Sequence, residues 1–418
     1  MKWTEYLRAL RERMLQRRPD FAEPIAQDVV ETPYYRERSV GYATAQMIIL
    51  LVLAVFLAAS LLTGSARLSM ENWTLLISDL SGAVVLPETG GTESLTYRAD
   101  EANRFVSYRG GLAVLGQDRL TLFTASGREN YSVALGYHDP QLLSTGKALI
   151  AWDRGGTRLA AYHSFSKLFD TTTSSPIRDV SASESGYLCV VTDDNAYASC
   201  VTLYDADFDM ISRIHLKEHT VCTAVSADGE QMAAASVFSK DGQLQLSLLL
   251  LQPGMSEPQT TQTFFGVYPV SMQYTKDALL LLCTDRVLVL DAQGQTVSEV
   301  PFAAEDLLGA SLDANGCILN MRANNYNADT RVLALDASGE IGWDVTLTAQ
   351  LVDAALSQDG VLYVLCENSV SLYERRATQS AGTLALRASY QMLLPAGEDE
   401  VFLCGEAKAV CVRLEREE

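Results

Sequence analysis

The sequence lacks an excess of basic residues: 32 lysines and arginines stand against 52 aspartates and glutamates, and the formal net charge is −20. Binding of nucleic acid depends on basic side chains that displace phosphate counterions, so this composition argues against a nucleic-acid partner. The acidic excess lies after residue 64, where 24 basic residues face 45 acidic ones. Such a balance is more typical of a well-solvated outer domain than of a site for a basic ligand.

The sequence also lacks the linear motifs of common enzyme classes. It has no nucleophile elbow, no phosphate-binding loop and no pair of carboxylates in a recognisable glycosidase context. The stretch HLKEH at residues 215–219 has the residue order of inverted zinc peptidases, whose chemistry needs both histidines on one helical face. Strand-like sequence on both sides places this stretch on a connection between two strands, which the repeats described below assign to neighbouring propeller blades. We therefore predict no zinc site from the motif.

A second stretch imitates the start of a calcium loop. Asp205, Asp207 and Asp209 alternate as calcium ligands do, but Leu216 stands at the twelfth position, where a glutamate is needed, and no glycine stands at the sixth. The simpler interpretation is that Asp205 starts a tight turn, as an aspartate does in two similar stretches, at Asp291 and Asp336. We therefore predict no catalytic, cofactor-binding or metal-binding residues.

One long hydrophobic run is present, at residues 43–62 (ATAQMIILLVLAVFLAASLL), and it contains no charge. At about 1.5 Å per residue, a helix of this length covers the hydrocarbon core of a bilayer. No small-x-small cleavage site follows it, so we predict an uncleaved transmembrane helix over residues 40–63. Eight basic residues precede the run and only Arg67 follows within the next twenty, which predicts a single-pass protein of the cell membrane, with residues 1–39 cytoplasmic and residues 64–418 extracytoplasmic.

The cytoplasmic tail begins with a basic amphipathic pattern over residues 3–18. Trp3, Leu7, Leu10 and Met14 have helical spacing on one face, and arginines occupy the rest. Such a helix is expected to contact the inner leaflet or a cytoplasmic partner, with a short solvated helix as the alternative. Three prolines then divide residues 19–39 into pieces too short for stable helices, which predicts a linker.

All eight cysteines lie in the outer part of the chain. Several end apolar stretches such as LLLLC and LYVLC, which are typical of strand interiors where a free thiol packs as a small hydrophobe. We predict buried single thiols, with a disulfide between Cys404 and Cys411 across one hairpin as the alternative.

From residue 103 onward the sequence is repetitive, with a short strand, a turn and an apolar strand in each unit. Equivalent first-turn positions are Gly110, Gly146, Gly186, Gly229, Asp277, Gly316, Gly360 and Gly397. Their separations range from 36 to 48 residues with a mean near 41, the period of a four-stranded propeller blade. A second turn recurs in the units, as in VLDAQGQT at 289–296 and ALDASGEI at 334–341.

Eight such positions predict an all-β, eight-bladed β-propeller, with seven blades as the alternative because the units around residues 186 and 229 are irregular. The last unit has only three strands before the chain ends. Strand-like sequence at residues 73–79 (WTLLISD) and 83–88 (AVVLPE) precedes the first whole unit, so we expect one of these stretches to supply the missing outer strand. Joining the two ends of the chain in one blade removes exposed sheet edges.

The unit SADGEQMAAAS at 226–236 resembles WD40-like repeats, and LDASGEIGW at 335–343 resembles the quinoprotein blade. The arrangement of basic tail, single span and propeller is similar to an uncharacterised family of membrane-anchored propeller proteins of clostridial, Gram-positive bacteria. That resemblance implies a scaffold and no particular reaction. Only Trp343 occupies the blade-docking tryptophan position of quinoproteins and no adjacent cysteine pair is present, so we predict no quinone or other cofactor.

The expected function is therefore binding or scaffolding at the cell envelope, with a protein or glycan of the envelope as partner. The alternative is a hydrolase or lyase that acts on glycan through the central funnel, since a propeller can assemble a site from several blades without a linear motif.

Overall fold

The computed structural model describes residues 45–51, 94–99, 103–124, 127–255, 258–323, 329–397 and 399–416. The chain divides into two compact units, 1–68 and 69–418. In the first, residues 45–51 are helical with exposed side chains. Among the described residues, no helix has both the length and the apolar character needed to cross a bilayer. The rest of the predicted span at 43–62, the tail at 1–39 and the stretches 73–79 and 83–88 lie outside the described residues.

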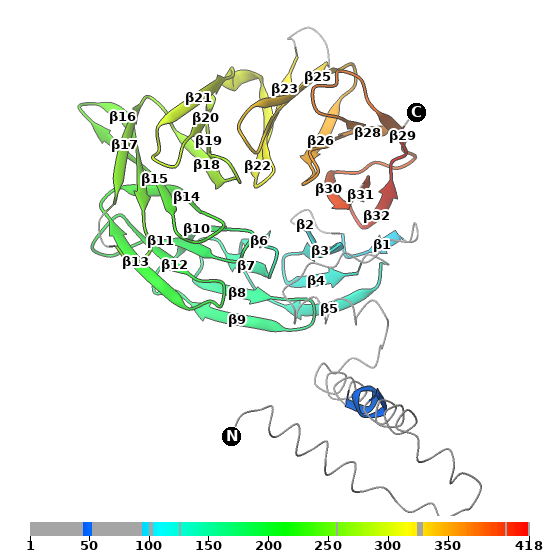
Figure 1. Ribbon diagram of the computed structural model, residues 1–418, viewed down its shortest axis with the longest axis horizontal. Helices are drawn as coiled ribbons and strands as arrows, with labels where there is room; N and C mark the ends of the chain where they lie inside the picture. The colour runs from blue at the N-terminus through cyan, green and yellow to red at the C-terminus, as the bar shows by residue number, and fades with distance from the viewer. Residues whose placement is uncertain are drawn as a thin grey trace, which may run out of the picture. The chain divides into compact units, whose positions relative to one another are not determined.

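In the second unit the described residues form eight four-stranded antiparallel sheets, arranged as the blades of a propeller (Figure 1). We number the blades 1 to 8 from β2. Blades 1 to 4 are β2 (Arg104–Tyr108), β3 (Gly111–Leu115), β4 (Arg119–Phe123), β5 (Glu129–Ala134); β6 (Pro140–Ser144), β7 (Leu149–Asp153), β8 (Arg158–Tyr162), β9 (Lys167–Thr172); β10 (Ile177–Ala182), β11 (Leu188–Thr192), β12 (Ser199–Tyr204), β13 (Met210–Leu216); and β14 (His219–Val225), β15 (Met232–Lys240), β16 (Gln243–Leu251), β17 (Thr260–Phe265).

Blades 5 to 8 complete the ring, with one short 3-10 helix, η1 (Ala304–Asp306), before β22. They are β18 (Pro269–Tyr274), β19 (Leu279–Cys283), β20 (Arg286–Leu290), β21 (Thr296–Pro301); β22 (Leu307–Asp313), β23 (Gly316–Arg322), β24 (Thr330–Asp336), β25 (Ile341–Leu347); β26 (Leu351–Leu356), β27 (Leu362–Cys366), β28 (Ser369–Tyr373), β29 (Gly382–Ala385); and β30 (Met392–Gly397), β31 (Glu400–Cys404), β32 (Lys408–Arg413), β1 (Ser94–Thr96). The first strand of each blade lies nearest the centre (Figure 1).

The core is divided among the interfaces between neighbouring blades, which explains the unbroken apolar runs in the sequence. In β19, Leu279, Leu281 and Cys283 pack toward blade 4, whereas Leu280 and Leu282 pack toward blade 6. A strand buried on both faces has no polar side to show, so it reads as a continuous hydrophobic stretch. Outer strands such as β17, with alternating half-buried and exposed residues, keep the period of two.

Blade 8 closes the ring with a strand from the N-terminal side of the propeller. β1 pairs with β32 in the register Ser94↔Val410, Leu95↔Ala409 and Thr96↔Lys408. The eight-blade prediction and the closure by an N-terminal strand are confirmed, and the seven-blade alternative is wrong. The closing strand is not 73–79 or 83–88 but the tripeptide SLT. With a single apolar residue, this strand is too short to show a period, and only its partner strand identifies it.

The predicted turns are confirmed, and the aspartates that start them act alike. Asp205 Oδ1 accepts the amides of residues 207 and 209 at 2.9 Å each. Asp291 and Asp336 make the same pair of bonds, at 2.8 to 3.1 Å, to the amides two and four residues further on. Asp205, the first of the three alternating aspartates, is therefore a turn residue, as the sequence predicts.

All eight cysteines fall within the described residues, and each is buried and free. Cys404 stands opposite Ala409 and Cys411 stands opposite Phe402, so the two thiols are not cross-strand partners. Burial raises the pKa of the Cys189, Cys317 and Cys404 thiols. The prediction of buried single thiols is confirmed, and the Cys404–Cys411 disulfide is wrong.

Candidate functional site

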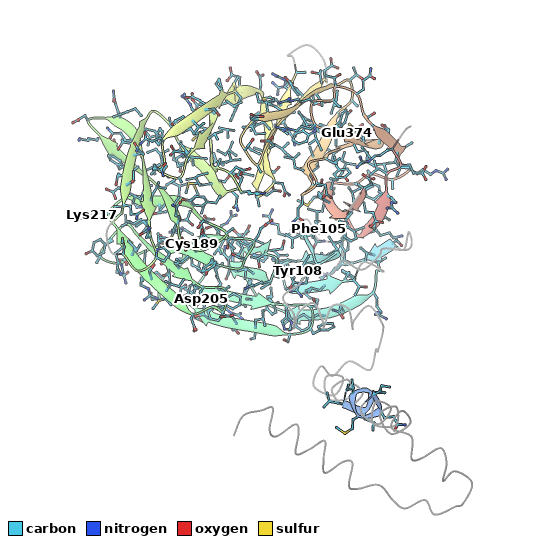
Figure 2. The ribbon with its side chains drawn as sticks, viewed as in Figure 1. Phe105, Tyr108, Cys189, Asp205, Lys217 and Glu374 are labelled. Carbon is cyan, nitrogen blue, oxygen red and sulfur yellow. The ribbon has the colours of Figure 1, made fainter. Side chains whose placement is uncertain are left out.

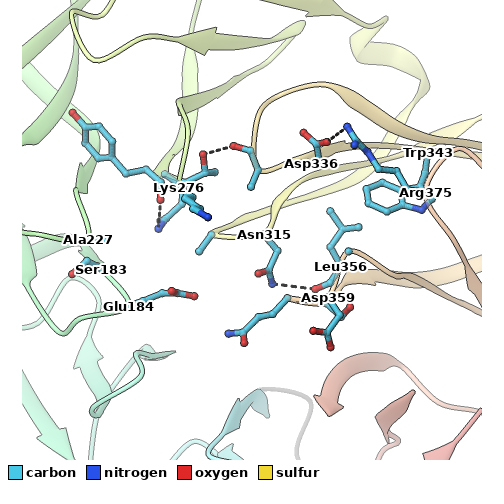
Figure 3. A pocket seen from close by; sticks show the side chains of 18 of the residues that line it. Ser183, Glu184, Ala227, Lys276, Asn315, Asp336, Trp343, Leu356, Asp359 and Arg375 are labelled. Atoms are coloured by element: carbon cyan, nitrogen blue, oxygen red, sulfur yellow. Dashed lines mark hydrogen bonds and ion pairs between the residues drawn. The ribbon is translucent and has the colours of Figure 1, made fainter. Parts of the chain in front are cut away.

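A cavity of about 580 Å³ opens at one end of the central channel (Figure 3). Five consecutive blades, 3 to 7, each contribute to it the turn between their first and second strands. Its lining combines carboxylates, amides and hydroxyls with apolar side chains such as Val225, Trp343 and Leu356. A concave site of this volume with a few convergent polar groups is typical of a ligand pocket.

Hydrogen bonds between neighbouring blades hold the rim of this pocket. The Gly146 amide donates to the Glu184 carbonyl at 2.9 Å, and the Ser185 hydroxyl donates to the Ala227 carbonyl. Further round the ring, Asn315 Nδ2 donates to the Leu356 carbonyl at 3.2 Å. Because these contacts already order the turns, a ligand that binds there loses little free energy to the ordering of the loops.

The charged side chains of the pocket fall into two groups. Arg375 is bound to Asp336 and, at 2.9 Å, to Glu340, so these charges are largely satisfied. Glu184, Lys276 and Asp359 form no ion pair within the part of the chain that the structure describes, and Figure 3 shows them on different sides of one open space. The groups left to meet a ligand are therefore two carboxylates and one ammonium.

The pocket continues into a second cavity of about 360 Å³, lined mainly by first strands. Ser183, Glu184 and Asn315 line both cavities, so the two are parts of one channel. The second cavity contains two further carboxyls. Burial raises the pKa of Asp179 to about 6 and that of Asp313 to about 6, and the negative charge of Glu184 adds to the rise at Asp313.

Asp313 is an exposed residue, yet removal of solvent around its carboxyl raises its pKa as in a buried group. The position at the channel explains both. The residue keeps an accessible surface on the channel side, but the surrounding blades exclude most of the bulk solvent that would stabilise the charge of its carboxyl.

Asp179 and Asp353 occupy equivalent positions and join neighbouring first strands. Asp353 accepts the Ala354 amide at 2.9 Å and, from the next blade, the Leu393 amide at 2.8 Å. Asp179 likewise accepts backbone bonds from Val180 and, in the next blade, Thr223. Each aspartate stands seven residues before a first-turn glycine, so an alignment of the units on those glycines provides a sequence signal for this joint, which the turn pattern alone does not reveal.

The first-strand carboxyls predict how stability depends on pH. Burial raises the pKa of Asp179, Asp313 and Asp353 from 3.8 to about 6. Between these two values the folded protein binds more protons than the unfolded chain, so the free energy of unfolding falls as pH rises. Denaturant titrations should therefore give a higher unfolding midpoint at pH 4.5 than at pH 7.

Two variants distinguish the titration of a buried carboxyl from the loss of one negative charge in general. Asp313→Asn keeps an oxygen for the turn amides that Asp313 Oδ1 now accepts, and it should flatten the pH slope. Asp344→Asn is the matched control, because the pKa of Asp344 is lowered by its bonds to Arg331 and this carboxylate stays ionised throughout the window. An equal slope in Asp313→Asn and the unaltered protein would contradict the assignment.

The HLKEH stretch lines neither cavity, whereas Trp343 of the quinoprotein-like stretch lines the pocket. His215 is in β13 and His219 begins β14, so HLKEH spans the connection between blades 3 and 4 and lies on no helix, as predicted. Lys217, at its centre, lies at the outer margin of the ring (Figure 2). Trp343 is 2% exposed and docks blade 6 on blade 7, where its Nε1 donates to the Tyr373 carbonyl at 3.1 Å.

A comparison with protein families finds a match to part of the chain, and the function of that family is unknown. Residues 91–268, less than half of the chain, match a family described as "Family of unknown function (DUF5711)". A search of curated proteins finds no match. The family description names no reaction, ligand or location.

Several solved structures are similar to this chain, each at low sequence identity and low TM-score. BBS1N, in complex with ARL6DN, is 10% identical with a TM-score of 0.42, over 78% of this chain and 96% of that one. Hydrazine synthase of Kuenenia stuttgartiensis is 10% identical with a TM-score of 0.42, over 66% and 95%. A functionally unknown protein from Desulfotomaculum acetoxidans DSM 771 is 12% identical with a TM-score of 0.42, over 70% and 98%. At these values the similarities carry no argument about function.

Proposed function

We propose that the propeller is a binding module of the cell envelope, and that the pocket at the channel mouth receives a basic segment of a protein partner. One observation carries this proposal: the pocket contains two carboxylates, Glu184 and Asp359, and one ammonium, that of Lys276, none of which forms an ion pair within the described chain. Turns of five blades form the rim that holds these groups. The uncharged run at 43–62 and its basic N-terminal flank support an anchor in the membrane, with the propeller outside the cell.

The pocket suits lysine or arginine side chains in both charge and shape. Asp179 and Asp313 line the adjoining cavity, so the potential of the channel becomes more negative as these carboxyls ionise. The apolar walls formed by Val225 and Leu356 provide contact for the aliphatic stems of such side chains. A volume of about 580 Å³ admits a few side chains and not a folded domain.

Binding is better supported than glycan hydrolysis or elimination. A general base must have a pKa near the working pH, but burial and the nearby charge of Asp228 raise the pKa of the Tyr274 hydroxyl. Asp336, a further carboxylate of the pocket, is already held by Arg375 and by turn amides. Asp179 and Asp313, whose pKa values near 6 would suit a general acid or base, line the adjoining cavity and are each held by backbone amides. The groups that remain in the pocket itself, Glu184, Lys276 and Asp359, can recognise a charged ligand.

Titration with a fluorescent hexalysine peptide at low salt tests this proposal on the full-length chain in detergent. The double variant Glu184→Gln, Asp359→Asn should weaken binding, and Lys276→Gln should strengthen it, each by about two- to fivefold because the groups are partly solvated. Fluorescence anisotropy measures both changes.

The control is Glu305→Gln with Glu406→Gln, which removes the same charge from exposed sites that do not line the pocket. This control should bind as the unaltered chain does. Equal weakening in the pocket and control variants would show that binding follows net charge, and the proposed site would be wrong. Binding of chitin oligosaccharides in preference to hexalysine would replace the basic ligand by a glycan.

The membrane anchor predicts a distinct protease pattern. Protease added to intact cells stripped of their walls should digest residues after about 64 and spare the tail at 1–39, because the membrane shields only the cytoplasmic side. Immunoblots with antibodies to each part measure this. Protection of the propeller in intact cells would contradict the proposed topology, whatever the outcome of the peptide titration.

A further inference from the structure

The outer part of blade 3 brings together three side chains of metal-ligand type, Asp194, Cys200 and His215. Cys200 in β12 and His215 in β13 are directly opposite each other in the antiparallel pair. Asp194 comes from the connection between β11 and β12. One possible ligand atom of each residue lies within 4.8 Å of the other two.

Neighbouring groups orient two of the three side chains. His215 Nδ1 and Asp194 Oδ2 are 2.7 Å apart and share a hydrogen bond. Asp194 Oδ1 accepts the amides of Ala196 and Tyr197 at 2.8 and 2.9 Å. The ring of Tyr197 also lies against the imidazole, with centroids 5.4 Å apart. Supports of this kind are typical of the residues around metal ligands.

We propose that Asp194, Cys200 and His215 bind a divalent transition-metal ion, with Zn²⁺ the best match. Thiolate and imidazole ligands select such ions over Ca²⁺ or Mg²⁺, which prefer oxygen. Three protein ligands leave a fourth tetrahedral position for water. Ligand atoms around a tetrahedral zinc ion are about 3.3 to 3.6 Å apart, so a small side-chain rotation makes room for the ion in place of the Asp194–His215 hydrogen bond. The neutral imidazole then binds through Nδ1 and carries its proton on Nε2.

Access and charge suit this ion. Cys200 is 6% exposed, whereas the side chains of Asp194 and His215 are 14% and 44% exposed, so the site is open on the side of the imidazole. Binding displaces the thiol proton to solvent, and the two anionic ligands then balance the dication. Burial raises the pKa of the free Cys200 thiol, which distinguishes it from a reactive, nucleophilic cysteine.

This site is not the one that the linear motif suggests. HLKEH pairs His215 with Glu218 and His219, but in the fold the partners of His215 are Asp194 and Cys200, 21 and 15 residues earlier in the chain. His219 belongs to the next blade. The shared histidine therefore allows a direct test of which grouping binds metal.

The test titrates the full-length chain with Co²⁺ alone and records the near-ultraviolet absorption that a thiolate–cobalt bond produces. The unaltered protein should develop this band, and Zn²⁺ should remove it by competition. His215→Ala and Asp194→Asn should lower the affinity for Co²⁺ at least about tenfold, since each loses a ligand. Cys200→Ser should abolish the band. The matched control His219→Ala should leave it unchanged.

Absence of the band in the unaltered protein would overturn the proposal, and so would equal losses in His215→Ala and His219→Ala. Cys200 is buried, so its variant is informative only if circular dichroism shows intact strands. The partly exposed His215 and Asp194 carry the test in either case, because their replacement leaves the core between the blades in place.

Discussion

A chain that begins at Arg98 should unfold at a lower temperature than one that begins at Arg67, and it should aggregate. The shorter chain lacks β1, so the edge of β32 that pairs with Ser94–Thr96 is left open. It also lacks Leu95, which is 1% exposed and packs between Phe105 of blade 1 and Phe402 of blade 8. Because this interface joins the two ends of the ring, its loss should destabilise the whole propeller and expose an edge that pairs with other chains.

Single variants of the full-length chain test the same joint without truncation. Leu95→Ala should cost about 2 to 5 kcal/mol, the range for a large-to-small change in a packed core. Thr96→Ala, its exposed neighbour on the same strand, should change stability by less than about 0.5 kcal/mol. Thermal unfolding and light scattering measure both effects. If the chain that begins at Arg98 is as stable and monodisperse as the longer one, β1 does not close the ring.

Replacement of Trp343 by alanine should cost about 3 to 5 kcal/mol, the usual range for a buried tryptophan. Its ring fills the interface between blades 6 and 7, among residues that include Ile318, Ala354 and Leu362. Its Nε1 also satisfies the Tyr373 carbonyl. The variant therefore loses packing on both blades and leaves a buried acceptor without its donor. Urea denaturation of the full-length chain measures the change.

The two buried tryptophans among the described residues of the propeller, Trp152 and Trp343, allow packing and hydrogen bonding to be measured separately. Trp152 is 7% exposed, and its Nε1 has no hydrogen-bond partner among the described residues. Trp343→Phe should therefore cost more than Trp152→Phe, by about 1 to 2 kcal/mol, because only the first substitution removes a buried hydrogen bond. Equal costs would show that the bond from Trp343 to Tyr373 contributes nothing.

The architecture of the propeller could be predicted from the sequence because its signals are local. A first-turn residue recurs near every forty-first position, and second strands such as LLLLC and LYVLC show burial on both faces. Asp205, Asp291 and Asp336 each accept their turn amides from within four residues, so the turn that they start is specified by the adjacent sequence. The buried thiols follow from the same strand pattern.

The sites could not be predicted, because ring geometry assembles them from distant residues. Glu184, Lys276 and Asp359 share one pocket although they come from blades 3, 5 and 7.

The same limit applies to the closing strand and to the proposed metal site. Only the pairing of β1 with β32 identifies residues 94–96 as the closing strand, since one apolar residue carries no period. Cys200 meets His215 because two strands pair in one register, and a shift by a single residue would turn one side chain to the other face. By itself the sequence determined the number and pattern of the blades, through burial and hydrogen bonds made within each repeat. The tertiary structure alone decided which side chains meet, because those contacts depend on strand register within a blade and on how the blades pack around the channel.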